Sequence, residues 1–345
     1  MNRKAGSVSL QQQRIRSGRV DPIAPPDRNN FYQRLEPRGN SILHGAGQEN
    51  LGEYLDYQHA LAKDTQPTLY MTYVELKNEN IVAWGRDLQR GLDKIGGFVI
   101  PQIAINMADV LDGKHHYEAD VAAGVYDKKI LQLVQVLAAL KRPVFLRIGD
   151  EFNGFWMGYD PAEFILAYQR IARFIRGHFL QEVALVWNFS VDSIDFDYMS
   201  FYPGDCYVDW WAVNLFSKEA IELPMTRQFV NDAQTHRRPI MIGESTPRHL
   251  GVTGGGRSWN GWFVPYFNFV RSHPNIKAFS YISTDWSKYG GVDSLFNTWG
   301  DSRIQNNAYV LERYQAELYE PCYLHRIDER RMRSILGLSS GAESR

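Results

Sequence analysis

The stretch that decides the fold is PVFLRIGDEFNGFWMGY, residues 143–159. It begins with a short apolar run, residues 144–148, which is interrupted only by Arg147. Pro143 precedes the run and Gly149 follows it, as expected of a strand buried in a parallel sheet. The second half of the stretch is acidic and rich in aromatic residues. The stretch therefore predicts a core strand whose carboxyl end carries polar chemistry.

Glu151 lies at the tip of this predicted strand and is our first catalytic candidate. Side chains alternate along a strand, so we expect Phe145, Arg147, Gly149 and Glu151 to share one face. A core strand has no structural need for a carboxylate at that position. We therefore expect Glu151 to serve chemistry at the end of the strand.

Eight strand-like segments are predicted along the chain, and most are separated by helix-like patterns. They cover residues 41–48, 68–75, 97–105, 144–148, 183–190, 208–216, 239–246 and 276–286. Buried strands that alternate with helices predict an α/β fold, a (β/α)8 TIM barrel. An open doubly wound sheet is the alternative, but no G-x-G-x-x-G follows the first strand.

We predict that the barrel spans residues 39–320. Residues 1–38 are polar and rich in Arg, Gln and Pro, so we expect a disordered or loosely packed N-terminal extension. Residues 321–345 are predicted to form a charged C-terminal tail. A chain of 345 residues buries roughly three quarters of its unfolded surface, so the fold needs neither a disulfide nor a metal.

The composition argues against several classes of partner. The 38 Lys and Arg residues nearly balance the 39 Asp and Glu residues, so we expect neither nucleic acid nor a membrane surface as a partner. No apolar run of about 18 residues predicts a membrane span. Cys206 and Cys322 define no zinc site, and His115-His116 beside Glu118 lacks a spaced third ligand, so we predict no metal and no cofactor.

The N-terminus is basic but has no apolar core of a secretory signal. Localisation stays open: we expect either a cytoplasmic protein or a secreted one whose leader lies outside this chain.

A second carboxylate, Glu244, ends the seventh predicted strand in PIMIGESTP. It has the same parity as Ile240 and Ile242, which we expect to face inward. Barrels place their active sites at the carboxyl ends of the strands, so the tips of strands four and seven meet at one mouth. Glycoside hydrolysis requires two carboxyl groups, of which one protonates the leaving oxygen and the other attacks or activates water. A salt bridge from Glu244 to Arg147 or Arg248 is the structural alternative.

Three motifs resemble glycoside hydrolase family 26. LRIGDEFNGFW, residues 146–156, is similar to the acid/base motif of that family, in which an Arg precedes His-Glu-x-Asn-Gly-x-Trp. YPGDCYVD, residues 202–209, resembles its Y-P-G-D-x-Y-V-D segment, and MIGES, residues 241–245, resembles its nucleophile strand. The resemblance covers about residues 40–315.

The resemblance implies roles for three residues. Glu151 is expected to be the general acid/base, Glu244 the nucleophile and Trp286 the sugar platform at the cleavage subsite. It also implies a retaining mechanism, for which the two carboxyl groups lie about 5–5.5 Å apart. The substrates of the family are chiefly β-mannans, with β-1,3-xylan and mixed-linkage β-glucan in some members. We therefore expect hydrolysis of a polysaccharide or oligosaccharide, β-1,4-mannan first, with those two glycans as alternatives.

Five further side chains are candidates for substrate binding. An amide at Asn153 is expected near both glutamates, where it could bind a sugar hydroxyl. Trp156 and Trp259 could line sugar subsites, although each could equally belong to the core. His44 ends the first predicted strand, and Asp150 directly precedes Glu151.

Two positions depart from the family pattern. Asp150 stands where a histidine normally precedes the acid/base glutamate, and Phe216 stands where a tyrosine that hydrogen-bonds the nucleophile is expected. A carboxylate at Asp150 could raise the pKa of Glu151, which a general acid can use. These departures leave a second interpretation open, a carbohydrate-binding barrel with impaired turnover.

A third interpretation uses the glycine-rich segment Gly254–Arg257, which follows the seventh strand. Many barrels hold phosphate at that place. A phosphosugar isomerase or aldolase would bind phosphate there and would need a Lys or His at a strand end. His44 is the obvious candidate for that group.

Overall fold

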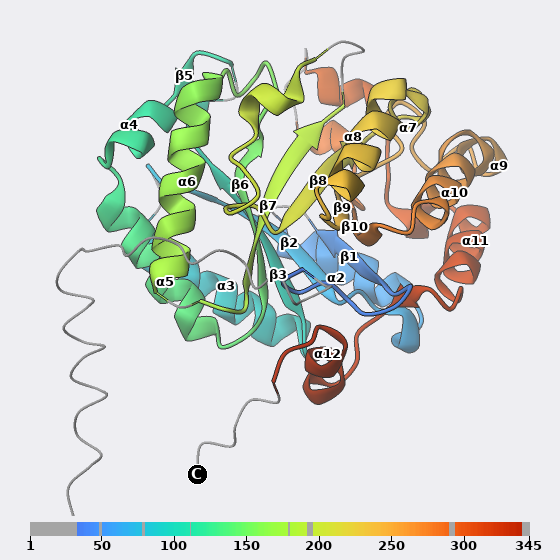
Figure 1. Ribbon diagram of the computed structural model, residues 1–345. Helices are drawn as coiled ribbons and strands as arrows, with labels where there is room; N and C mark the ends of the chain where they lie inside the picture. Colours follow the sequence, from blue (N-terminus) through green and yellow to red (C-terminus); the bar gives the residue numbers. More distant parts are fainter. Residues whose placement is uncertain are drawn as a thin grey trace, which may run out of the picture.

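The computed structural model describes residues 33–47, 50–77, 80–110, 112–178, 180–191, 196–289 and 294–339. Eight parallel strands form a closed barrel, in which β10 pairs back with β1 (Figure 1). The predicted (β/α)8 barrel is thereby confirmed. The strands are β1 (Ile42–Gly47), β2 (Leu69–Glu75), β3 (Ile100–Asn106), β6 (Val144–Glu151), β7 (Val183–Ser190), β8 (Trp210–Leu215), β9 (Ile240–Ser245) and β10 (Ile276–Tyr281).

Helices surround the strands and cover their outward faces (Figure 1). The longer ones are α2 (Leu51–Ala60), α3 (Ile81–Ile95), α5 (Asp127–Leu140), α6 (Pro161–Gly177), α8 (Pro224–Thr235), α10 (Val264–Ser272) and α11 (Ala308–Leu318). Shorter ones are α4 (Glu118–Ala123), α7 (Lys218–Glu222) and α9 (Gly256–Ser258), and a π-helical turn at Trp259–Phe263 joins α9 to α10. Short 3-10 segments occur at Lys63–Thr65, Tyr198–Phe201, Trp286–Lys288, Leu295–Thr298 and Ile304–Asn306. None of the helices within the described ranges is long and apolar enough to cross a membrane.

Local sequence explains where these helices form. In α5, Ile130, Leu133, Val134 and Leu137 recur at helical spacing and are all buried. The carboxylate of Asp160 accepts hydrogen bonds from the first free backbone N–H groups of α6, and proline occupies the first helical position. The amphipathic stripes turn these helices toward the barrel.

Strand side chains alternate between the barrel interior and the helical layer. Trp210 packs with the inward-facing residues near the base, whereas Trp211 packs with the helices. On β2, Leu69 faces inward and Tyr70 outward in the same way. Where the strands are regular, this alternation fixes which side chains face the barrel interior.

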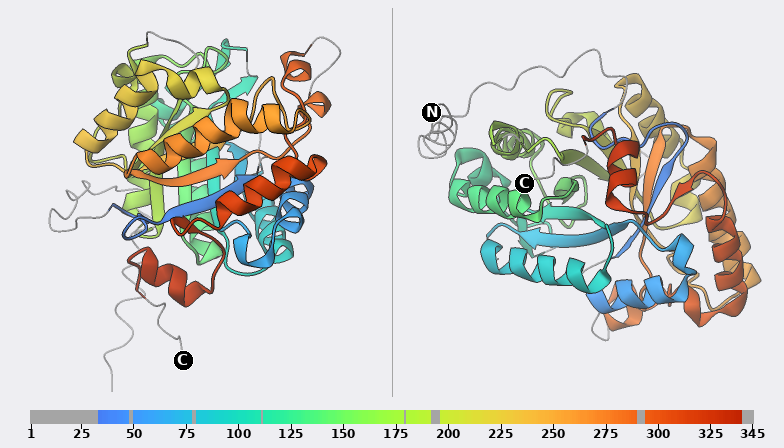
Figure 2. Two further views of the ribbon diagram at one scale, coloured as in Figure 1. Left: turned by 90° about the vertical axis from the view of Figure 1, so that its right-hand side faces the viewer. Right: turned by 90° about the horizontal axis from the view of Figure 1, so that it is seen from below.

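Both ends of the described chain close the base of the barrel. Three apolar side chains pack against inward-facing strand residues: Leu35 near the start, Met332 in α12 (Glu329–Ile335) and Leu336, which directly follows this helix. The indole Nε1 of Trp210 donates to the backbone oxygen of Arg34 at 2.6 Å. In Figure 1 α12 lies below the barrel, and the right-hand view of Figure 2 looks at the barrel from that end.

The segment predicted as a charged tail is therefore folded onto the barrel as far as residue 339. β11 (Tyr323–Leu324) pairs in parallel with the start of β1, ahead of the point where β2 begins to pair. The apolar pair Met332 and Leu336 lies one helical turn apart, so α12 presents an apolar face to the base. Within the predicted N-terminal extension, residues 33–38 pack here too, and residues 1–32 lie outside the described ranges.

Candidate active site

Strand β6 carries a bulge just before Glu151. Between Arg147 and Glu151 it advances by four residues while its neighbour β7 advances by two. Gly149 and Asp150 adopt left-handed backbone conformations within this bulge, with φ of 85° and 49°. The bulge turns the side chains of Asp150 and Glu151 toward the same mouth, whereas a regular strand would send neighbours to opposite faces.

The bulge also corrects the predicted face of this strand. Phe145 and Arg147 face the interior, and Glu151 reaches the mouth, as expected. Gly149 does not share their face, because a Cβ atom there would overlap the ring of Phe164 on α6. A side chain at Gly149 would thus collide with the helical layer.

Strand β9 brings Glu244 to the mouth by a similar device. Ile240 and Ile242 pack with the helices and Met241 faces the interior, so the predicted inward orientation of the two isoleucines was wrong. Between Ile242 and Ser245 this strand advances by three residues while β8 and β10 each advance by two. The extra residue aims Glu244 inward, although alternation alone would send it outward.

Arg147 is fully buried and joins two carboxylates at the mouth. Its Nη2 donates to Glu244 Oε1 at 2.7 Å and also pairs with Asp150. Its Nη1 lies 3.3 Å from the sulfur of Met71. The salt bridge considered as a structural alternative for Glu244 exists, but it forms within the carboxylate cluster itself. Tyr73 adds a second hydrogen bond to Glu244 Oε1, at 2.9 Å.

Glu151 has different surroundings. Its Oε1 accepts a hydrogen bond from Asn214 Nδ2 at 2.7 Å. Burial, and then the negative charges of Glu244 and Asp150, raise the pKa of Glu151 to about 8, against the opposing hydrogen bonds from Asn214 and Ser190. Glu151 therefore holds its proton at neutral pH, while Glu244 is paired with a guanidinium. Two carboxyl groups in such unlike environments are suited to acid and base roles.

A layer of polar side chains lies between Glu151 and Glu244 and the barrel interior. Gly243 has no side chain, and a Cβ atom there would lie 2.8 Å from Asn214 Oδ1 and closer still to Asn188. Gln102 donates to the backbone oxygen of Gly243 at 2.9 Å and accepts from Ser280 at 2.7 Å. The missing side chain thus lets two asparagines approach beneath Glu151.

Sequence reasoning missed Tyr73 and Asn214. Both lie on the inward parity of their strands: Tyr73 comes two residues after Met71, and Asn214 comes two residues after Ala212. A polar residue at an inward position near the carboxyl end of a barrel strand was the signal that could have found them.

The sequence model of glycosyl hydrolase family 26 matches residues 70–236, which include β6 and β8. The chain belongs to glycosyl hydrolase family 26.

Two curated relatives of this family 26 hydrolase align over most of its length. A beta-1,3-xylanase of an Alcaligenes species is 27% identical over 312 residues, which is 82% of this chain and 65% of the relative. A beta-1,3-xylanase of a Vibrio species is 26% identical over 313 residues, which is 84% of this chain and 67% of the relative. The chain thus spans about two thirds of the length of these relatives.

A solved structure shares the fold. A double mutant of the Cellulomonas fimi endo-beta-1,4-mannanase has a TM-score of 0.56 and 16% identity, over 84% of this chain and 73% of that chain. At this identity the likeness shows the shared barrel alone.

Trp286 of the family 26 hydrolase lies near the carboxylates but is only 3% exposed. It clusters with Met71 and Phe216, and Met71 in turn contacts Arg147. The ring of Phe296 stacks on Trp286 with a centroid distance of 5.5 Å and an interplanar angle of 20°. Trp286 therefore lies at the mouth with Phe296 packed against it, and its role as a sugar platform stays a prediction.

Asn153 and Trp156 lie in the loop after β6. The amide of Asn153 exchanges two hydrogen bonds with the backbone of Ser190, at 2.7 and 2.8 Å, and so ties the loop to β7. Trp156 is half-buried, and its backbone oxygen accepts from Gly113 N at 2.7 Å. The structure thus gives Asn153 a bracing contact that the sequence did not predict.

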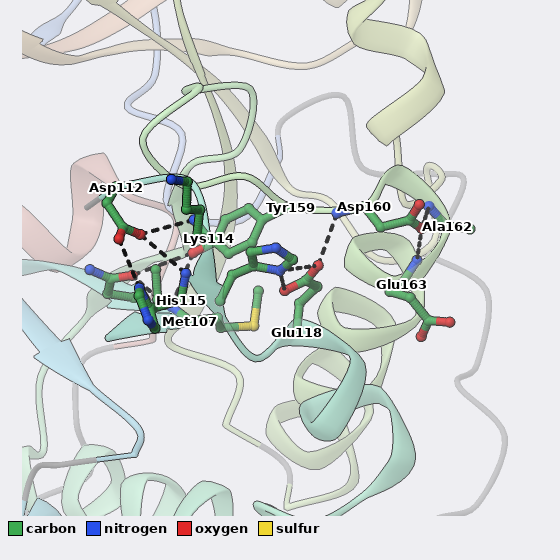
Figure 3. A network of polar contacts seen from close by, with 12 residues as sticks. Met107, Asp112, Lys114, His115, Glu118, Tyr159, Asp160, Ala162 and Glu163 are labelled. Carbon is green, nitrogen blue, oxygen red and sulfur yellow. Dashed lines mark hydrogen bonds and ion pairs between the residues drawn. The ribbon is translucent and has the colours of Figure 1, made fainter. Parts of the chain in front are cut away.

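A short hairpin and the helix α4 also contact the loop after β6. The hairpin consists of β4 (Ala108–Val110) and β5 (His115–His116). Figure 3 shows its polar contacts: His115 pairs with Asp112, and the buried Glu118 accepts from the backbone N of Asp160 at 2.9 Å. Glu118 also pairs with His116 at 2.8 Å. The two histidines thus have separate partners, and no group of three metal-ligating side chains occurs in the described part of the chain.

Two predicted binding residues lie away from the mouth. His44 faces the helical layer, where it stacks on Phe279 and pairs with Tyr57 at 2.6 Å and His325 at 3.0 Å. Trp259 stacks on Phe263 in the outer layer. Both predictions are corrected. On β1 it is Leu43, and not His44, that faces the barrel interior, and the indole of Trp259 packs between helices. The phosphosugar interpretation thereby loses its candidate histidine.

Proposed function

We propose that this family 26 hydrolase is a retaining β-glycosidase with Glu151 as general acid/base and Glu244 as nucleophile. The observation that supports it is the contrast between the two carboxyl groups. Burial and neighbouring negative charge raise the pKa of Glu151 to about 8, whereas Glu244 is paired with Arg147 and accepts from Tyr73. Retention begins with one protonated and one ionised carboxyl group.

The proposed reaction has two steps. Glu244 attacks the anomeric carbon while the glycosidic bond breaks, and Glu151 gives its proton to the departing oxygen. Glu151, now ionised, takes a proton from water, whose oxygen attacks the anomeric carbon and releases Glu244. This chemistry requires the carboxyl groups about 5–5.5 Å apart, and it uses no cofactor.

We propose β-1,3-xylan as the first substrate to test. The two relatives with the longest alignments described above are named beta-1,3-xylanases. Asp150 and Phe216 also depart from the family pattern described above, so that pattern does not by itself select the glycan. β-1,4-Mannan is the second candidate, because the segment LRIGDEFNGFW resembles the family's acid/base motif.

The test is release of reducing sugar from β-1,3-xylan, mannan, galactomannan and mixed-linkage β-glucan. We expect release from one glycan class, with Glu151→Ala and Glu244→Ala both reduced by at least about 1,000-fold. Glu163→Ala is the control, because this glutamate lies in the first turn of α6, outside the carboxylate cluster. Normal turnover in both active-site variants would overturn the assignment. Binding of a glycan without release would select the impaired binding barrel instead.

Two further measurements assign the roles. Proton NMR of the first product reports its anomeric configuration, and inversion would rule out the retaining mechanism. Azide should restore turnover in both alanine variants but with opposite stereochemistry. Glu151→Ala should yield the β-glycosyl azide from the covalent intermediate, and Glu244→Ala the α-glycosyl azide by direct displacement.

A further inference from the structure

The two oxygens of Glu244 are not equivalent. Oε1 accepts from both Arg147 Nη2, at 2.7 Å, and the Tyr73 hydroxyl, at 2.9 Å. Among the described residues no hydrogen bond reaches Oε2. One oxygen is therefore held by two donors, and the other is left for a ligand.

Tyr73 is held firmly enough to orient this carboxylate. Its backbone pairs with Ala104 of β3, and its carbonyl accepts from Trp84 Nε1 on α3 at 2.9 Å. Burial, and then the charge of Glu244, raise the pKa of Tyr73 well above its ordinary value. The hydroxyl thus keeps its proton and can donate to Glu244 at any working pH.

Phe216 cannot provide this hydrogen bond. It follows β8, is 7% exposed, and packs in an apolar cluster with Ile282 and Trp286. Its ring has no donor, so the carboxylate takes its second hydrogen bond from β2 instead of from the end of β8.

We infer that Tyr73 is the positioning residue of the nucleophile, and that it performs from β2 the task which the family pattern gives to a tyrosine at position 216. Tyr73 and Arg147 fix Oε1, so that Oε2 forms the bond to the anomeric carbon as the glycosidic bond breaks and Glu151 protonates the leaving oxygen. This inference rests on the proposed retaining function. It adds Tyr73 as a second hydrogen-bond donor to Glu244, and it identifies Oε2 of Glu244 as the attacking atom.

The first test compares Tyr73→Phe with Tyr70→Phe, which lies on the same strand and faces the helices. Loss of a hydrogen bond to an ionised group should lower kcat by about 10- to 100-fold in Tyr73→Phe, with KM nearly unchanged. Tyr70→Phe should keep kcat within about twofold. Wild-type kcat in Tyr73→Phe, or an equal loss in both variants, would overturn the inference.

An activated aryl glycoside separates positioning from acid catalysis. Its leaving group needs no proton, so the defect of Glu151→Ala should shrink on this substrate. The defect of Tyr73→Phe should persist, because attack by Glu244 is still required. A Tyr73→Phe defect that disappears there would contradict a role at the nucleophile.

The exchange of positions is tested by the double variant Tyr73→Phe/Phe216→Tyr. Partial or full recovery of kcat would support the equivalence of the two positions, and a double variant as slow as Tyr73→Phe would overturn that equivalence.

If the wild type releases sugar from no glycan, the proposed function is wrong, and the inference about Tyr73 needs a test that does not depend on activity. Crystal structures of wild type and Tyr73→Phe then decide the inference alone: an unmoved Glu244 carboxylate contradicts it, and a rotated one supports it.

Discussion

The base of this barrel is closed by apolar side chains, whereas its mouth gathers charges that are unfavourable to bury. At the base, Leu35, Met332 and Leu336 cover the inward-facing strand residues. Each such side chain contributes roughly 1.5–3 kcal/mol when it is fully buried. At the mouth, a buried guanidinium and a protonated Glu151 stand where apolar packing would be more stable.

The mouth also leaves polar atoms unpaired. Within the described residues, neither amide atom of Asn188 has a hydrogen-bond partner, and Oδ1 of Asn214 and Nε of Arg147 have none. Such buried groups cost about 1–3 kcal/mol each when they stay unsatisfied. The barrel therefore takes its stability from the base and the helical layer, and keeps at the mouth groups that a ligand can use.

The largest effect should come from Gly243→Ala. A Cβ atom there must push aside Asn188 and Asn214, and the second of these orients Glu151. The ends of these side chains can move, so we expect activity to fall by about 1,000-fold while the free energy of unfolding changes by only about 1 kcal/mol. Steady-state kinetics measure the loss of activity, and urea unfolding measures the change in the free energy of unfolding.

Gly45→Ala is the matched control. Its Cβ atom would lie 2.7 Å from Leu69 Cβ and 2.9 Å from the backbone oxygen of Phe279, neither of which can swing away. This variant should lose stability instead of selectively losing activity. If Gly45→Ala and Gly243→Ala lost activity and stability to the same extent, the mouth and the base would not differ as we describe.

Met332→Ala should show the reverse pattern. Met332 is fully buried beneath the barrel, so its truncation should destabilise the fold by about 2–4 kcal/mol and leave kcat unchanged. Met199→Ala, at an exposed methionine, should change the free energy of unfolding little. A fall in kcat in the folded Met332→Ala protein would show that base and mouth are coupled.

The barrel itself was predictable because buried strands and amphipathic helices leave a periodic record in the sequence. The catalytic candidates were predictable only in part, because Glu151 and Glu244 end their strands within recognisable motifs. Their orientation was not, since it depends on bulges at Gly149–Asp150 and Gly243–Glu244 that alternation cannot reveal. Glycine before each acidic segment is the only sequence trace of these bulges.

Two features were harder to predict from the sequence: the helix that closes the base of the barrel, and the burial of aromatic or imidazole rings. A strand that is apolar on both faces does not show which parity points inward, and so His44 was assigned to the wrong side of β1. α12 was missed because its apolar pair is surrounded by arginines and glutamate, which read as a solvated tail.

Glu151→Gln should make the mouth more stable at high pH. The pKa of Glu151 is raised to about 8 in the folded protein, so the wild type is fully stable below the unfolded value, near 4.5, and loses stability as pH rises to about 8. The neutral amide avoids this loss and can still accept from Asn214. Urea unfolding should favour the variant by roughly 4–5 kcal/mol at pH 9 and show almost no difference at pH 4. An equal difference at both pH values would contradict the raised pKa.

Asp150→Asn should shift the pH profile with the smallest loss of rate. Burial is the main cause of the raised pKa of Glu151, and the charges of Glu244 and Asp150 add to it. Removing the charge of Asp150 should lower that pKa, so the general acid loses its proton earlier and the basic limb of kcat/KM moves down by about one pH unit. Asp160→Asn is the control, since its carboxylate caps α6 outside the cluster and should leave the limb in place. A basic limb that stays fixed in Asp150→Asn would mean that burial and the charge of Glu244 set the pKa of Glu151, and that the aspartate serves only to hold Arg147.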